Sequence, residues 1–343
     1  MTDALFHAYT SLFGWIGVGL LLSRLLPETI PHWLGRGLFW IGMPIEIFAL
    51  ARHTDFSHVV LLTPVATLSI LTLGLSLAFG FLQINQRWPL GWLGLRGQST
   101  LSLYPNPAWS GWSATIPGDD GTHPKGLSEA QKGSFVLSAM LGNTGFVGLA
   151  IAATLLSPEN LGIAAFFAVL HNVFGLYGVG VFVSHHFGQS EAMAGWQTSL
   201  WAILKVPSLW AFGLGVATQS IFLPASTEAG LDQCVWIVIP CAFVLTGMRL
   251  CQIRNWHTLV SGVLPATVKV LMMPAIVALL TPYLGIVGEP RLALVLMAGT
   301  PTALTTLVLA EEYNLDRDVM ASSIALSMVA LIPLVPLWIA IVA

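Results

Sequence analysis

The sequence predicts an all-α membrane protein with ten transmembrane helices, arranged as two inverted five-helix repeats. Of its 343 residues, 55% are hydrophobic and only 8% are charged, and the mean hydropathy is +0.80. Soluble domains carry about 25% charged residues. Apolar runs of about 20 residues, long enough to cross a bilayer, recur along the chain. Two of these runs are interrupted halfway by similar short polar segments.

Ten apolar runs account for most of the chain and leave no room for a separate catalytic domain. The first run lacks a basic leading segment and a small-residue cleavage site, so we interpret it as a membrane span rather than a signal peptide. The expected spans are 5–25, 35–51, 58–82, 131–156, 160–184, 202–223, 231–250, 258–281, 291–312 and 319–342.

The basic residues indicate the orientation in a cell or inner membrane, because loops on the inner side are rich in Lys and Arg. With the N-terminus outside, only Arg52 and Arg291 fall on the outer side. Both termini are therefore expected outside. The basic residues that fall inside are Arg24, Arg36, Arg87, Arg96, Lys125, Lys132, Lys205, Arg249, Arg254 and Arg317.

Several kinds of chemistry lack their usual motifs here. The cysteines Cys234, Cys241 and Cys251 have no paired spacing and are expected in the core rather than in disulfides or metal sites. No phosphate-binding glycine loop, metal-ligand spacing or Gly-x-Ser-x-Gly elbow occurs in the sequence. We therefore expect no enzyme, no ATP-driven pump, no cofactor, no metal and no nucleic-acid partner.

The two halves of the chain match each other in the same order. Five spans in each half is an odd number, so the second half is expected to lie upside down relative to the first, as in many secondary transporters. The first repeat is expected at 1–83 and 131–184, and the second at 202–343. The matching segments are 17–19 with 213–215, 40–44 with 236–240, and 64–69 with 265–269, the first two pairs at an offset of 196 residues.

Residues 84–130 form the one large irregularity and are expected as an inside loop. They are rich in Gly, Pro, Ser and Trp. The simpler interpretation is a linker whose tryptophans rest at the membrane interface, and a regulatory or partner-binding role is the alternative. The tryptophans are Trp88, Trp92, Trp109 and Trp112.

The interrupted spans are the main candidates for a substrate site. Gly142-Asn143-Thr144-Gly145 and Gly299-Thr300-Pro301-Thr302 each lie roughly 15–18 Å deep, near the bilayer midplane. A helix that restarts there has unpaired N–H groups and the positive end of its dipole at the midplane, which favours an anion. Substrate-binding candidates are Asn143, Thr144, Gly145, Thr300, Pro301 and Thr302. The alternative is that these residues only kink packed helices.

Lys269 is the one basic residue in the middle of a span. Burying it costs at least about 2.5–3.5 kcal/mol on insertion scales, so a function within the membrane is the default hypothesis. Lys269 is expected either to hold an anionic substrate or to fix a neighbouring polar backbone group.

Two further ionisable residues are candidates for ion or proton coupling. Glu46 follows Pro44 and is expected to reach the surface, to carry a proton or to pair with a cation. His171 is either a hydrogen-bonded core residue or a proton carrier, since its pKa suits that task. Glu311 and Glu312 end the ninth span and are expected at a solvated helix end.

The ninth and tenth spans and the fourth span resemble those of the auxin efflux carrier family, which includes the plant PIN-type carriers. The resemblance rests on Pro301 to Val319 and on Gly142 to Leu149. Residues 205–215 and 239–247 are similar to the family's sixth and seventh spans. The resemblance implies a scaffold of spans one, two, six and seven and a moving transport domain of spans three to five and eight to ten. It also implies small organic anions, such as auxin or dicarboxylates, carried outward by a homodimer.

Two differences from the family pattern concern the crossover. Gly142 stands where the family often has proline, and Leu149-Ala150 replace a second proline. The related bile-acid–sodium symporters use a carboxylate near the ninth-span crossover, where this chain has only Thr and Pro, so sodium coupling is disfavoured.

These observations predict a secondary transporter that exports a small organic anion, either an auxin-like aromatic acid or a dicarboxylate, by alternating access. The substrate is expected at the crossover of helices four and nine, with membrane lipid around the protein and proton coupling as one driving force. The alternatives are a sodium-coupled organic-anion importer and a non-transporting membrane sensor or scaffold.

The orientation is testable by cysteine labelling in intact cells. An impermeant maleimide is expected to label Pro158→Cys, which lies in an outside loop, and not Gly118→Cys, which lies in the inside loop. Labelling at 118 and not at 158 would reverse the orientation.

Overall fold

The computed structural model describes residues 2–27, 29–53, 62–87, 127–188, 204, 207–251 and 259–342. Across these ranges the chain is helical, with a single isolated β-bridge between Gly142 and Thr302. This confirms the all-α expectation. Most of the expected inside loop, residues 88–126, lies outside the described residues, as does Lys205.

Within the described residues, six continuous helical stretches are long and apolar enough to cross a membrane, and three shorter apolar helices accompany them. The expected number of ten spans stays a prediction, because several of them are divided into shorter helices. The six stretches are Thr29–Arg52, Leu62–Ile84, Pro158–Phe187, Ala225–Met248, Leu259–Leu284 and Arg317–Val342, and the shorter helices are Gly14–Leu25, Thr144–Leu155 and Pro207–Ala217.

The first half of the chain begins with α1 (Thr2–Leu25) and a bent helix made of α2 (Thr29–Gly37), the π-helical turn η1 (Leu38–Gly42) and α3 (Met43–His53). It continues with α4 (Leu62–Arg87), α5 (Glu129–Met140), η3 (Thr144–Gly148), α6 (Leu149–Leu155), α7 (Pro158–Leu170), η4 (His171–Gly180) and α8 (Val181–Phe187).

The second half contains α10 (Pro207–Ala217), α11 (Ala225–Cys251), α12 (Leu259–Thr267), η6 (Val268–Met272), α13 (Met273–Leu280) and η7 (Thr281–Leu284). It ends with α14 (Glu289–Ala298), α15 (Thr305–Glu312) and α16 (Arg317–Val342).

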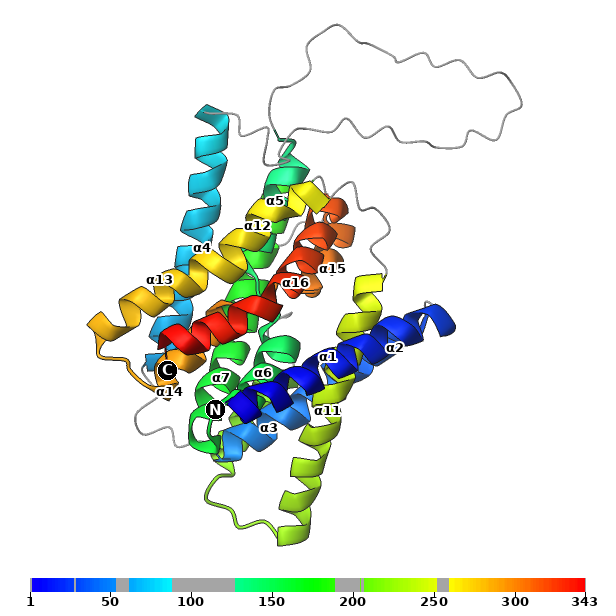
Figure 1. Ribbon diagram of the computed structural model, residues 1–343, viewed down its shortest axis with the longest axis vertical. Helices are drawn as coiled ribbons and strands as arrows, with labels where there is room; N and C mark the ends of the chain where they lie inside the picture. The colour runs from blue at the N-terminus through cyan, green and yellow to red at the C-terminus, as the bar shows by residue number, and fades with distance from the viewer. Residues whose placement is uncertain are drawn as a thin grey trace, which may run out of the picture.

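The helices form two groups (Figure 1). In one group α1 packs along α11, and α3 packs between α10 and α11. In the other, α12 packs on α16, α7 on α14, and α5 on α4 and α16. The groups meet where α3 and α10 contact α7, α1 contacts α6, and α11 contacts η3.

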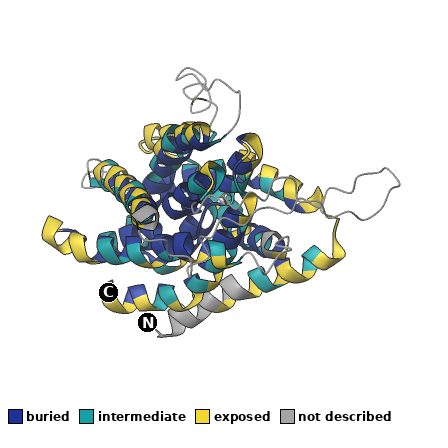
Figure 2. Ribbon diagram, turned by 90° about the horizontal axis from the view of Figure 1, so that it is seen from above, coloured by how far each residue is buried: buried dark blue, intermediate teal, exposed yellow. Residues whose placement is uncertain are grey.

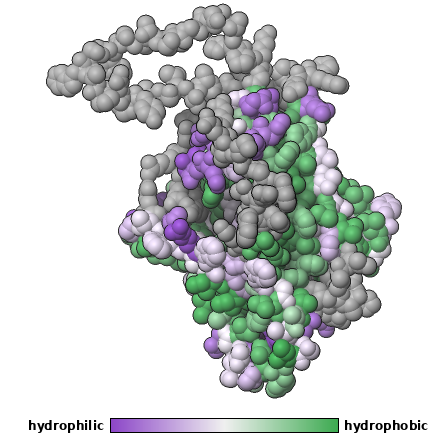
Figure 3. Space-filling model, turned by 180° about the vertical axis from the view of Figure 1, so that it is seen from behind, coloured by the Kyte–Doolittle hydropathy of each residue, from purple (hydrophilic) through white to green (hydrophobic). Residues whose placement is uncertain are grey.

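Buried side chains concentrate in the middle of the molecule, and exposed residues lie at its periphery (Figure 2). Hydrophobic side chains also cover much of the described outer surface (Figure 3). Trp40 and Trp236, which match each other in the two halves, are 57% and 76% exposed. Such an apolar exterior suits a lipid environment, where it needs no protein partner.

The N-terminal ends of α7 and α14, in the second group, are linked by hydrogen bonds. The Glu289 carboxylate, at the first residue of α14, accepts hydrogen bonds from the Ser157 hydroxyl (2.6 Å), the Ser157 N–H (3.0 Å) and the Asn160 amide (2.9 Å). These bonds, chiefly those from Ser157, lower the pKa of Glu289. They join the start of α14 to the start of α7, two helices from different halves of the chain.

The helices of the first group approach closely at glycines. A Cβ added at Gly19 of α1 would lie 2.2 Å from the Val244 carbonyl oxygen and 3.0 Å from Gly247 in α11. A Cβ added at Gly215 of α10 would lie 2.7 Å from the Cβ of Ala51 in α3. Gly19 corresponds to Gly215, and Ala51 to Gly247, at the same offset of 196 residues. The same close contact is therefore made twice, each time between the two halves.

These contacts predict a position-specific effect of added methyl groups. Gly19→Ala and Gly215→Ala are expected to lower the free energy of unfolding by about 1–3 kcal/mol each, because rigid backbone or a short side chain occupies the space. Gly17→Ala and Gly213→Ala are the matched controls, since a Cβ at either site meets nothing within 4 Å. Thermal unfolding of the purified variants in detergent measures the difference. Equal losses at Gly17 and Gly19 would contradict it.

Candidate functional site

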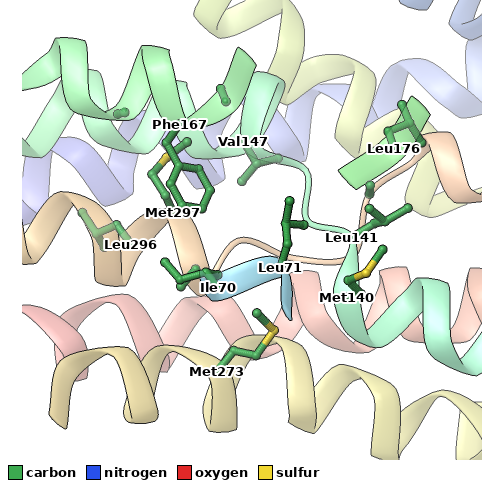
Figure 4. Packing of buried hydrophobic residues seen from close by; sticks show 14 of the residues in the cluster. Ile70, Leu71, Met140, Leu141, Val147, Phe167, Leu176, Met273, Leu296 and Met297 are labelled. Atoms are coloured by element: carbon green, nitrogen blue, oxygen red, sulfur yellow. The ribbon is translucent and has the colours of Figure 1, made fainter. Parts of the chain in front are cut away.

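The two interrupted spans cross each other as short extended segments. The Asn143 N–H donates to the Pro301 carbonyl (2.7 Å), and the Ala303 N–H donates to the Leu141 carbonyl (3.0 Å). These two bonds flank the bridge between Gly142 and Thr302. They pair backbone groups that the breaks would otherwise leave unsatisfied away from water. Apolar side chains such as Leu71, Leu141 and Met273 pack around the crossing (Figure 4).

A helix restarts on each side of the crossing. The Asn143 carbonyl accepts from the Val147 N–H (3.2 Å) and the Gly148 N–H (3.0 Å), and the Asn143 side chain makes no capping hydrogen bond. On the other side the Thr306 N–H donates to the Ala303 carbonyl (3.1 Å) as α15 begins. Residues 142–146 and 303–305 line the same pocket, so both half-helix N-termini meet there.

The pocket lies between the two helix groups. The first group contributes residues from η1, α3 and α10, and the second contributes the crossing segments and η4. Its polar lining residues are Asn143, Thr144, Asn172, Ser208 and Thr305, and its larger apolar and aromatic ones are Phe39, Met43, Phe146, Leu176, Tyr177 and Leu304. None of the described residues that line it carries a charge.

Thr144, which begins η3, and Ser208 in α10 line the pocket, and both residues are buried. Their hydroxyl oxygens are themselves buried and have no hydrogen-bond partner within the described structure. Buried hydroxyls are normally paired, so these two have bonding capacity left for a ligand. Among the described residues, no three His, Cys, Asp or Glu side chains gather closely enough to hold a metal ion.

The structure divides the expected site residues into two sets. Asn143, Thr144 and Gly145 line the pocket. Thr300, Pro301, Thr302 and Lys269 are not among the lining residues.

Thr302 anchors the second crossing segment to its neighbours. Its hydroxyl donates to the Ser138 carbonyl of α5 (3.0 Å) and lies 2.8 Å from the Ser323 hydroxyl of α16. Its N–H donates to the Ser327 hydroxyl (3.0 Å). Thr302 thus fixes the position of the crossing rather than facing the pocket.

Lys269 is 1% exposed, and its ammonium donates to the Ala298 carbonyl at 2.5 Å. Ala298 is the last residue of α14, where carbonyl groups lack helical partners and the dipole is negative. Of the two roles expected for Lys269, the contact seen is the fixing of a polar backbone group. Thr300, two residues later, donates its hydroxyl to the Met297 carbonyl (3.0 Å).

The coupling candidates are both buried. Glu46 lies in α3, and one of its carboxyl oxygens has no hydrogen-bond partner within the described structure. His171 begins η4, where its Nε2 accepts from the Gly142 N–H (3.5 Å) and its ring stacks on Phe167. Glu311 is exposed at the end of α15 and pairs with Arg317 at 2.7 Å, as expected for a solvated helix end.

The second half of the chain carries a recognisable family pattern. Residues 194–339 match the membrane transport protein family. This is the family, which includes the auxin efflux carriers, that the sequence resemblance indicated. The chain is thus a multi-pass integral membrane protein whose second half carries a transporter family pattern.

Two archaeal proteins, each described as an uncharacterized transporter, are similar to this chain. The one from Methanocaldococcus jannaschii is 26% identical over 224 residues, which cover 64% of this chain and 71% of its own. The one from Methanothermobacter thermautotrophicus is 26% identical over 215 residues, which cover 62% of this chain and 69% of its own.

Neighbouring side chains leave no room for a side chain at position 142. A Cβ at Gly142 would lie 2.2 Å from the Thr300 hydroxyl and 2.9 Å from the Lys269 ammonium. The side chains of Thr300 and Lys269 therefore occupy the space that a side chain at position 142 would need.

Sequence reasoning did not single out Ser208, Thr305, Phe39 or Met43 as site residues. Asn172 had a partial signal, because it extends the polar interruption at His171 in the middle of a span. Ser208 and Met43 had none, since a single serine or methionine in an apolar run is ordinary. Only the packing of α10 and α3 against the crossing brings them to the pocket.

The packing at Gly142 predicts a non-additive pair of substitutions. Gly142→Ala is expected to lower the free energy of unfolding by about 1–3 kcal/mol. The same change in a Thr300→Ala background is expected to cost less, because the colliding hydroxyl is gone, with a coupling of about 0.5–3 kcal/mol. Gly178→Ala in η4 is the control, since its nearest contact would be an ordinary 3.6 Å. A double-mutant cycle of unfolding free energies measures the coupling, and strict additivity would contradict it.

Proposed function

We propose that this protein is a secondary transporter that moves a small organic anion by alternating access, with the substrate in the pocket at the crossing. The main support is that two half-helix N-termini meet in one pocket between the two helix groups. Two residues of that pocket, Thr144 and Ser208, have hydroxyl groups without a hydrogen-bond partner within the described structure. The transporter family match and the two archaeal transporters support the class of function.

The pocket's chemistry favours a carboxylate on an apolar body. Helix N-termini attract anions through their free N–H groups and dipoles. Asn143, Asn172 and Thr305 add neutral donors close by. Phe39, Phe146 and the other apolar lining residues would surround the rest of the molecule.

A second carboxylate would meet this apolar wall without a cation, and burying an unpaired charge is costly. We therefore favour an aromatic or branched monocarboxylic acid over a dicarboxylate.

The helix grouping supports a division into scaffold and transport domain. The scaffold would comprise α1, α2 to α3, α10 and α11, and the remaining helices would move against it. The proposed inverted repeat is supported by the twice-made glycine contact and by the crossing bonds. In these bonds residues 141 and 143 exchange roles with residues 301 and 303, at an offset of 160.

The proposed transporter exports its substrate and is coupled to protons through Glu46 or His171. It works as a homodimer with both termini outside. Lys269 would then keep the crossing in shape rather than contact the substrate. A sodium-coupled importer is the alternative within transport, and a non-transporting sensor or scaffold is the alternative outside it. Uptake into liposomes under a pH gradient or a sodium gradient separates the first two.

The site is tested by Asn143→Ala. Losing a buried hydrogen bond to a charged ligand should cost about 1.5–3 kcal/mol, roughly ten- to a hundredfold in affinity. Calorimetry with phenylacetate and other aryl carboxylates on the purified protein measures it.

Glu312→Gln is the control and should leave affinity unchanged, because Glu312 is exposed at the end of α15. Unchanged affinity in Asn143→Ala would overturn the proposed site. Failure of the folded wild type to bind or move any carboxylate would favour the sensor or scaffold.

A further inference from the structure

Met43 of α3 occupies a notch in the first crossing segment. A Cβ added at Gly145 would lie 2.1 Å from the methionine methyl carbon and 3.2 Å from its sulfur. The methyl group of Met43 therefore fills the space that a side chain at position 145 would take. Met43 is 3% exposed, and both Met43 and Gly145 line the pocket.

The local helix geometry aims Met43 at this place. Phe39 and Met43 are four residues apart and both line the pocket, as residues on one face of a helix do. The π-helical turn η1, which contains Phe39 and ends at Gly42, widens the helix immediately before Met43. π-Helical insertions of this kind occur frequently at functional sites.

We propose that Met43 sets the size of carboxylate that the pocket accepts, because its position as a pocket wall is fixed by the Gly145 notch. The inference rests on the proposed function and assigns a specificity role within that site. Methionine is unbranched and flexible, so its terminal methyl takes whatever space its neighbours leave. If a side chain at position 145 fills the notch, the Met43 side chain must turn away from it, and the open space beside Met43 is the pocket.

The pairing of Met43 with Gly145 is not required by the repeated architecture. Ile239 stands in place of Met43 at the offset of 196 that relates the scaffold helices. Thr305 stands in place of Gly145 at the offset of 160 that relates the crossing segments. The backbone crossing is common to both halves, whereas the notch occurs only in the first. Because the crossing forms in both halves without it, the packing of Met43 against Gly145 can serve substrate selectivity.

The chemistry of the wall also fits an aromatic ligand. A methionine sulfur makes favourable contacts with aromatic rings, and Phe39, Phe146 and Tyr177 line the same pocket. In contrast, the crossing segments that line the same pocket are tied by hydrogen bonds between Asn143 and Pro301 and between Ala303 and Leu141. Met43 is therefore a part of the wall that can move without breaking a backbone hydrogen bond.

The test compares a large and a small aryl carboxylate, 1-naphthylacetate and benzoate, by calorimetry on the full-length purified protein. Met43→Ala is expected to raise the ratio of naphthylacetate affinity to benzoate affinity at least tenfold, because it opens the wall. Gly145→Ala is expected to lower the same ratio at least tenfold, because the methionine is forced into the pocket. Single-methylene differences in apolar pockets give discriminations of about 10–200-fold.

The double variant Met43→Ala/Gly145→Ala is expected to return to within about threefold of the wild-type ratio, since the new alanine methyl lies near the lost methionine methyl. Met328→Ala is the matched control, because Met328 is a buried methionine of α16 that does not line the pocket. It should leave the ratio unchanged whatever it does to stability.

The outcomes separate this inference from the proposed function. If the folded wild type binds neither acid, the proposed function fails for this ligand class. If the wild type binds and the ratio is the same in wild type, Met43→Ala and Gly145→Ala, the specificity role is overturned. Should Gly145→Ala not fold, Met43→Ala decides by itself, because a shift of the ratio by at least tenfold supports the role and a smaller shift overturns it.

Discussion

Backbone pairing at the crossing of the two interrupted spans is the constraint on which the rest of this structure depends. Lipid offers no hydrogen bonds, so a break in a spanning helix persists only if other parts of the protein satisfy its backbone. Here the two breaks satisfy each other through Asn143 with Pro301 and Ala303 with Leu141. Each break therefore depends on the other half of the chain for its backbone hydrogen bonds.

Several features follow from that pairing. The crossing is surrounded by close-packed helices, and the glycines Gly142 and Gly145 leave room for neighbouring side chains. The buried Thr302 hydroxyl bonds the crossing to α5 and α16. The carbonyl end of α14 is left without a helical partner, and the Lys269 ammonium takes that place. With a cation serving the carbonyl end on one side and the N-termini opening on the other, the two sides of the crossing are electrostatically distinct.

Much of the fold could be predicted from sequence, because lipid imposes strong rules on composition and length. The all-helical class and the two central interruptions at 142–145 and 299–302 followed from runs of apolar residues and from helix-breaking residues at mid-depth. Within the described residues, six helical stretches are long and apolar enough to cross a membrane, and the breaks shorten the helices of the fourth and ninth expected spans. For example, α14 has 10 residues and α15 has 8.

The site was predictable only in part, because it depends on contacts between residues distant in sequence. The polar residues of the first crossing segment were found, since they interrupt an apolar span. The partner of Lys269 is a backbone carbonyl 29 residues away, and no side-chain pattern reveals it. Ser208 and Met43 come to the pocket through the packing of α10 and α3 near the crossing, and in sequence each is an ordinary residue of an apolar helix.

The Glu289 carboxylate has a consequence for the way the molecule can move. By accepting hydrogen bonds from Ser157 and Asn160, it joins the N-terminal ends of α7 and α14, two helices that also pack on each other. These contacts oppose sliding of α7 past α14, so in the proposed mechanism the two helices, which come from different halves of the chain, would move together. The displacement would then fall where this pair meets α3 and α10, the helices that bring Met43 and Ser208 to the pocket.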